Sequence, residues 1–227
     1  MLSPVDRFRR RFTAAALVAG GVAILVFLAT KTVNSGDEKD VLDSVAAHQQ
    51  LNAVSSVAQL LMVALMLPAL FGLLHLLRHR GARLAHLGVG LLLLNLVGNA
   101  VDVGHSSVVA GMVDDGVSSQ DVAVMAATNS DPALVVAVLF TLLGLLGFPV
   151  LAASLWRSGA VARAIPVLML FGMASFFVPL PEAIGGALLA AAFAWTGVRV
   201  LRAPDREWLD GWRACAPAAP AAEVKAA

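Results

Sequence analysis

Residues 52–77 read NAVSSVAQLLMVALMLPALFGLLHLL and contain no Asp, Glu, Lys or Arg. At a rise of about 1.5 Å per residue this segment makes a helix of about 39 Å, longer than the roughly 30 Å hydrocarbon core of a bilayer. Its apolar residues occupy every face of the helix, which suits contact with lipid and with other helices better than contact with water. The segment therefore predicts a transmembrane helix, and it decides the fold class.

The same pattern recurs along all 227 residues, which are 59% hydrophobic and 14% charged, with a mean hydropathy of +0.83. A soluble domain needs more charge to cover its surface, and no alternating ten-residue pattern indicates a membrane barrel. The first span is predicted to be retained, because its apolar run is longer than that of a signal peptide. We predict an all-α polytopic membrane helix bundle with six transmembrane helices, at about residues 12–30, 52–77, 84–104, 132–156, 164–181 and 183–201.

The basic residues set the predicted orientation. With the N-terminus inside, 14 of the 16 Lys and Arg residues lie in cytoplasmic segments, and only Lys31 and Lys39 lie outside. This distribution obeys the positive-inside rule in every short loop. Both termini are therefore predicted to be cytoplasmic. Residues 1–11 form a basic N-terminal segment, 12–202 the transmembrane domain, and 203–227 a cytoplasmic tail whose Ala/Pro-rich part is expected to be disordered.

Polar residues gather in the outer halves of the second and third predicted spans, where each such group is costly in lipid and so marks a candidate site. On the second span they lie about one turn apart on one face: His48, Asn52, Ser56 and Gln59. A matching face of the third span carries Asn95, Asn99, Asp102 and Ser106, with His105 beside them. Because these spans are antiparallel neighbours, we predict an outward-facing pocket between them. Its candidate residues are His48, Asn52, Ser56, Gln59, Asn95, Asn99, Asp102, His105 and Glu182.

The same residues have a plainer interpretation as hydrogen bonds between helices. Asn, Gln and Ser side chains commonly join neighbouring membrane helices, each contributing about 0.6 kcal/mol. Asp102 and Glu182 can equally be charges at the membrane interface. The sequence leaves both interpretations open. Elsewhere, Gly144, Gly147 and the Gly185–Gly186 pair are expected to be points of close helix packing.

The histidines do not form a recognisable cofactor site. His48 and His75 are separated by about 40 Å along one helix, so they lie at opposite membrane faces rather than facing a haem within the bilayer. His75 and His79 have metal-ligand spacing but lack the Glu of a zinc-protease helix. Cys215 is the single cysteine, which excludes a thiolate cluster within the chain. We expect no cofactor, no metal and no nucleic-acid partner.

Residues 73–88, LLHLLRHRGARLAHLG, resemble the hairpin between the second and third spans of uncharacterised multipass membrane proteins of high-GC bacteria. The resemblance implies the same topology and a place in the bacterial cytoplasmic (plasma) membrane. It implies no specific activity.

Three functional classes follow. The first is a small transporter-like or ligand-binding, sensory membrane module that uses the outward pocket, as a homo-oligomer or with other membrane subunits. The second is an accessory membrane subunit whose partners are lipids and other subunits. The third is an integral membrane enzyme acting on a lipid or prenyl substrate, terpene-cyclase-like, with Asp102 or Glu182 as the acid. No catalytic constellation is visible, which favours the first two.

Overall fold

The computed structural model describes residues 2–31, 38–114, 132–178 and 181–211, and every regular element in these ranges is a helix. Among the described residues, five helical segments are long and apolar enough to cross a membrane. These segments are α1 (Pro4–Thr30), α3 (Gln49–Leu77), α4 (Ala82–Asp114), α6 (Pro132–Leu145) continued by α7 (Gly147–Ser158), and α9 (Glu182–Arg202). The prediction of an all-helical chain built from long apolar helices is confirmed.

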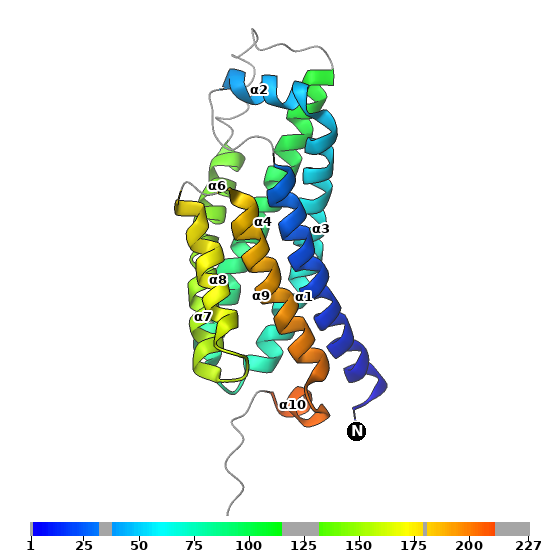
Figure 1. The fold of residues 1–227 in the computed structure, drawn as a ribbon, viewed down its shortest axis with the longest axis vertical. Coiled ribbons are helices and arrows are strands. Elements are labelled where there is room, and N and C mark those ends of the chain that lie inside the picture. The colour runs from blue at the N-terminus through cyan, green and yellow to red at the C-terminus, as the bar shows by residue number, and fades with distance from the viewer. Residues whose placement is uncertain (1, 32–37, 115–131, 179–180, 212–227) are drawn as a thin grey trace, which may run out of the picture.

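The remaining predicted span, at 164–181, corresponds to a shorter element. Helix α8 (Ala164–Ala174) is continued by the single 3-10 turn η1 (Ser175–Phe177). Together they extend about 20 Å, less than the roughly 30 Å of a hydrocarbon core. Helix α8 nevertheless packs against both α7 and α9 (Figure 1). The structure thus contains a helix at each predicted span, one of them short.

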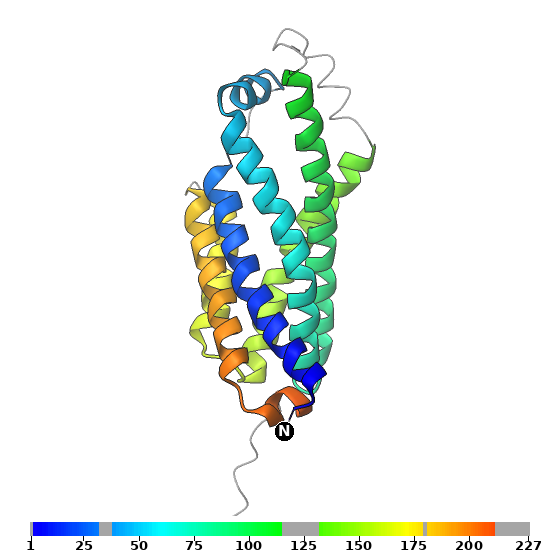
Figure 2. The ribbon, with the colours of Figure 1, turned by 90° about the vertical axis from the view of Figure 1, so that its right-hand side faces the viewer.

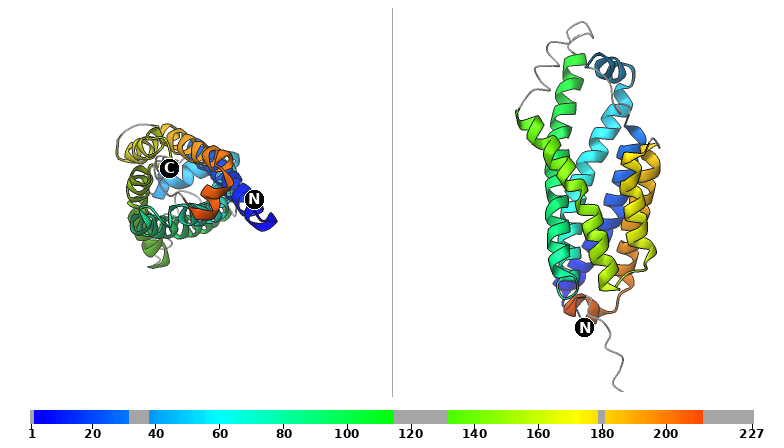
Figure 3. Two further views of the ribbon diagram at one scale, coloured as in Figure 1. Left: turned by 90° about the horizontal axis from the view of Figure 1, so that it is seen from below. Right: turned by 90° about the vertical axis from the view of Figure 1, so that its left-hand side faces the viewer.

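The long helices form a closed ring around one apolar core. In order around the ring, α1 packs on α3, α3 on α4, α4 on α6 and α7, α7 on α8, α8 on α9, and α9 on α1 (Figure 3). The most deeply buried side chains are large and apolar: Leu17, Leu70, Leu73, Leu151 and Phe193. The outer faces are apolar as well. On α6, for example, Leu139 and Leu142 are each about half exposed.

One end of the bundle, which we call the α10 end, carries two tight turns and both described chain ends. Gly81 joins α3 to α4 and Gly159 joins α7 to α8, with φ of +70° and +65°, a left-handed conformation that favours glycine. The two turns touch, because an Arg80 guanidinium nitrogen donates to the carbonyl of Ser158 at 3.0 Å. This contact ties the α3–α4 hairpin to the α7–α8 hairpin.

The short helix α10 (Asp205–Asp210) lies across this end, close to the start of α1 (Figure 1). It is held by an ion pair between Arg10 and Asp205 at 3.1 Å and by Trp208, which is buried against His75. Helix α1 begins at Pro4, capped by the Ser3 hydroxyl, so the basic segment predicted at 1–11 forms its first turns. Of the predicted tail, residues 203–211 are described, and the Ala/Pro-rich part that follows lies outside the described residues.

The opposite end, which we call the α2 end, carries a helix that the sequence analysis does not predict. Helix α2 (Glu38–Ala47) lies across this end, over α3 and α4 (Figures 1 and 2). Its Leu42 and Val45 pack against Val109 of α4 and form a small apolar cluster apart from the main core. At the α2 end, α3 and α4 extend beyond the first turn of α9 (Figure 2).

Candidate functional site

A pocket of about 840 Å³ lies at the α2 end, between the upper turns of α3 and α4. Helix α2 covers it, and the last turn of α1 closes one side. Five of the predicted site residues line it: Asn52, Ser56, Gln59, Asp102 and His105. They come from both predicted polar faces, so the structure brings the upper parts of the two faces together around one cavity.

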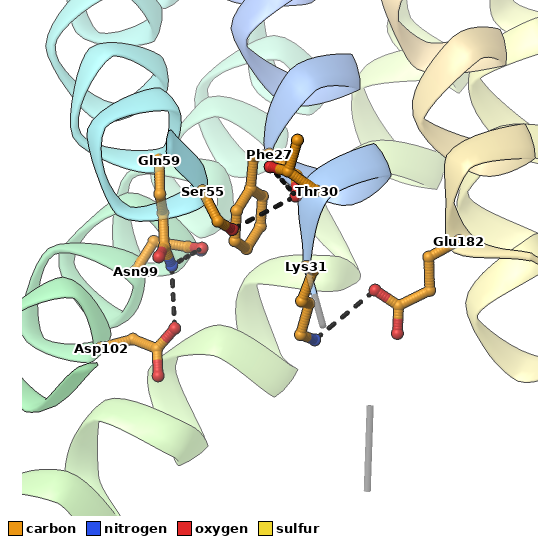
Figure 4. Close-up of polar contacts among 8 residues, drawn as sticks. All are labelled: Phe27, Thr30, Lys31, Ser55, Gln59, Asn99, Asp102 and Glu182. Atoms are coloured by element: carbon orange, nitrogen blue, oxygen red, sulfur yellow. Dashed lines mark hydrogen bonds and ion pairs between the residues drawn. The ribbon is translucent and has the colours of Figure 1, made fainter. Parts of the chain in front are cut away.

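Gln59 forms the inner boundary of the pocket and links α3 to α4. Its side chain is only 2% exposed, and its amide nitrogen donates to Asn99 Oδ1 at 3.0 Å and to Asp102 Oδ2 at 2.8 Å (Figure 4). A buried amide left without partners costs about 1–3 kcal/mol, so these two bonds fix the approach of the two helices at this level.

The lower part of the α4 face has a different role. Asn99 donates to the carbonyl of Asn95 at 2.9 Å, and Asn95 donates to the carbonyl of Thr141 on α6 at 3.0 Å. Neither Asn95 nor Asn99 is among the pocket-lining residues. The predicted polar face of α4 is therefore divided at the level where Gln59 of α3 contacts it. Above it the polar side chains line a cavity, and below it they join α4 to α3 and α6.

His48 and Glu182 lie at the margin of the site. His48 is exposed at the junction of α2 and α3, with a ring nitrogen 3.2 Å from the carbonyl of Ser44, and it does not line the pocket. Glu182, at the start of α9, is 3.5 Å from the Lys31 ammonium group, and Lys31 does line the pocket (Figure 4). Glu182 therefore does not line the pocket itself but pairs with a residue that does.

Comparison with protein families matches residues 12–201 to a family described as a domain of unknown function, DUF4386. The chain belongs to the DUF4386 family. The matched range runs from α1 to the end of α9, so the pocket and the helices around it lie within the DUF4386 domain. The resemblance to an uncharacterised family is confirmed at that level. No curated protein and no solved structure matches this DUF4386 chain.

Several residues of the DUF4386 pocket were not among the candidates predicted from the sequence. They come from α1 and α2: Phe27, Lys31, Val41 and Val45. The spacing of Val41 and Val45 is that of one helix face, which was a usable signal for α2. Lys31 gave a weaker signal, as one of two cations on the predicted outer side. The Thr141 carbonyl gave none, because any residue can supply a backbone acceptor.

The pocket of the DUF4386 domain ends at Gln59. Below this residue Asn95 and Asn99 bond to neighbouring helices, and other inward side chains of α3 and α4 are apolar and belong to the buried core: Met62, Met66, Leu92 and Leu96. We call these four residues the apolar layer. No polar side chain of the described α3 and α4 residues continues the pocket through this layer.

Metal-binding groups are also limited in the DUF4386 domain. Among the described residues there is no group of three or more His, Cys, Asp or Glu side chains that could hold a metal ion. The His75 ring packs at a tilt against Trp208 with ring centroids 4.9 Å apart, and a ring nitrogen lies 2.9 Å from the Trp208 carbonyl. The absence of a cofactor stays a prediction.

Proposed function

We propose that this DUF4386 protein is an integral protein of the bacterial cytoplasmic membrane, with six spans and both termini inside, which binds a small ligand from the outer side. The observation that carries the proposal is the 840 Å³ pocket between α3 and α4, with polar groups of both helices around it. A cavity of this size that combines apolar walls with a few polar groups is typical of small-molecule binding sites.

The membrane placement is supported by the outer surface and by the chain ends. Apolar side chains are exposed around the bundle, which is unfavourable in water but suits lipid. An even number of spans puts both ends on one side, in agreement with the positions of the α1 start and α10 in Figure 1. Counting α8 as a span requires a thinned or locally adapted bilayer, which costs only fractions of a kcal/mol per Å.

The depth of the pocket supports access from water. About 20 residues of helix cross the hydrocarbon core. Counted from Leu77 on α3 this length reaches Ala58, and counted from Leu84 on α4 it reaches Val103. Gln59 and Asp102 would then lie at the outer hydrocarbon boundary, with the pocket above them among headgroups and water.

A binding or sensory module fits this geometry better than the other two classes. Of the two acids that the enzyme class offers, Glu182 is paired with Lys31 and does not line the pocket, which leaves Asp102 as its candidate acid. The apolar layer favours binding from one side over an open channel. An accessory subunit would need no water-accessible cavity, so measured access to the pocket separates it from a ligand-binding module.

Single cysteines in a Cys215→Ser background test the proposal. In intact cells, a membrane-impermeant maleimide is expected to label Ser56→Cys and Asp102→Cys, because both positions line the pocket. Leu96→Cys, which lies on α4 like Asp102 but in the apolar layer, is the matched control and should not react. Ala162→Cys, in the turn after α7, should react only after the membrane is permeabilised.

Two results would contradict the proposal. Folded protein that stays unlabelled at both Ser56→Cys and Asp102→Cys would leave the accessory-subunit interpretation ahead. Labelling of Ala162→Cys in intact cells would overturn the proposed orientation.

A further inference from the structure

We propose that the ligand of this pocket carries an ammonium group with apolar substituents, and that Asp102 holds the ammonium group. This inference rests on the proposed function, since it names the class of ligand for the same pocket. It follows from the charges around the cavity, from the geometry of Gln59 and from the apolar walls.

Apart from His105, two ionisable side chains of the described residues line the pocket, Lys31 and Asp102, and they differ in their partners. Lys31 is within 3.5 Å of Glu182, so the two charges offset one another. Asp102 makes no ion pair with any residue in the described part of the chain, and its only hydrogen-bonding partner there is the neutral amide of Gln59. Among the described residues, Asp102 is therefore a pocket-lining carboxylate whose charge is not offset by an ion pair.

Gln59 prepares the Asp102 carboxylate for a ligand. Both partners of the Gln59 amide nitrogen are oxygens, so the amide group can only be oriented with its nitrogen toward them. The bond occupies Asp102 Oδ2 and leaves Oδ1 for another donor. Asp102 is an exposed residue of the pocket lining, so a ligand can reach Oδ1, and an ammonium group there would pair with the carboxylate charge.

The walls suit the rest of such a ligand. Phe27, Val41, Val45 and Val109 line the pocket from three different helices and offer an apolar surface to hydrocarbon substituents. Phe27 adds an aromatic ring, to which ammonium groups are attracted.

Two sources can present this chemistry. One is a free amine or quaternary ammonium compound in water. The other is the ammonium headgroup of a lipid in the outer leaflet, because the pocket lies at the proposed outer boundary of the membrane.

The test compares two thiol reagents with the same reactive group and opposite charge, trimethylammonium-ethyl and sulfonatoethyl methanethiosulfonate. Their rates are measured on Ser56→Cys in the Cys215→Ser background. One unit charge within a few ångströms, at a water-like dielectric, changes the ratio of the two rates by about tenfold. We expect Asp102→Asn to lower the cation-to-anion ratio about tenfold and Lys31→Gln to raise it. Ala47→Cys, on the exposed side of α2 and outside the pocket lining, is the reference whose ratio both changes should leave alone.

The source of the ammonium group is separated by protection. Tetrapropylammonium chloride should slow the labelling of Ser56→Cys in detergent if the ligand is a free amine. Slow labelling in phosphatidylethanolamine nanodiscs but not in phosphatidylglycerol nanodiscs, with no amine added, would identify a lipid headgroup. Asp102→Asn should abolish either kind of protection.

The outcomes distinguish this inference from the proposed function. If neither reagent labels Ser56→Cys, the water-accessible pocket itself is wrong. If both reagents label it but Asp102→Asn leaves the ratio unchanged, the pocket stands and the ammonium ligand is overturned. Absence of protection by both tetrapropylammonium and phosphatidylethanolamine would also overturn it.

Discussion

The two halves of α4 differ in how closely they approach their neighbours, and their glycines show the difference. Toward the α10 end, a methyl group added to Gly88 would lie 2.7 Å from the backbone nitrogen of Leu151, and one added to Gly98 would lie 2.6 Å from the carbonyl of Ala137. Toward the α2 end, a methyl group on Gly111, which lines the pocket, would have no atom within 4 Å; the exposed Gly90 and Gly104, one in each half, also meet none. The bundle is therefore closely packed at one end and open at the other, and the pocket occupies the open end.

The largest expected effect comes from a pair of glycine substitutions on α4. Gly98→Ala forces α4 away from the α6 backbone, and overpacking of this kind costs about 1–3 kcal/mol. Gly104→Ala meets no neighbour, and the higher helix propensity of alanine can add up to about 1 kcal/mol. The midpoint of thermal unfolding in detergent, followed by circular dichroism, should therefore fall below that of the wild type for Gly98→Ala and rise above it for Gly104→Ala. Equal effects of the two substitutions would remove the contrast between the two ends.

A smaller difference is expected between two polar residues of α4. Asn95→Ala removes a buried hydrogen bond to the Thr141 carbonyl, and such bonds between membrane helices contribute about 0.6–1.7 kcal/mol. Asp102→Asn keeps an oxygen for Gln59 and changes an exposed side chain, so we expect a stability change within about 0.5 kcal/mol. The same unfolding measurement tests both. A larger loss for Asp102→Asn than for Asn95→Ala would show that the pocket residues mainly stabilise the helices.

The smallest expected effect lies at the α10 end, on its surface. Asp205→Asn removes the ion pair with Arg10, but the Asp205 side chain is 48% exposed, so the loss should be below about 1 kcal/mol. Helix α10 stays attached through the buried Trp208. The difference in unfolding midpoint between wild type and variant should shrink in 1 M salt, because the Debye length there is only about 3 Å. A difference that salt leaves unchanged would mean that the ion pair is not its cause.

The long helices and the polar faces could be predicted from the sequence because both are local properties. Continuous apolar runs predict where the helices lie, and the spacing of Asn52, Ser56 and Gln59 predicts that they share one face of α3 without knowledge of any partner helix. The expected close packing at Gly144, Gly147, Gly185 and Gly186 is also seen, each with atoms of a neighbouring helix near the missing side chain.

The division of the α4 face at Gln59 could not be predicted, because it depends on tertiary packing. Gly98 and Asn95 hold α4 against α6 at one level, whereas Asp102 lies four residues beyond Gly98 and faces a cavity. The roof of the pocket was missed for a different reason. Helix α2 is short and half of its residues are polar, so its large apolar side chains are limited to Val41, Leu42 and Val45.

Spin-label accessibility along α4 tests the central claim most directly, in purified protein reconstituted in lipid. A water-soluble nickel chelate should reach labels at Asp102 and Ser106, which line the pocket, and should be excluded from Leu92 and Leu96 in the apolar layer. A label at Val97, exposed on the outer face, should favour oxygen over nickel, as expected in lipid. Nickel accessibility that is equally low at Asp102 and Leu96 would contradict a pocket open to water at the α2 end.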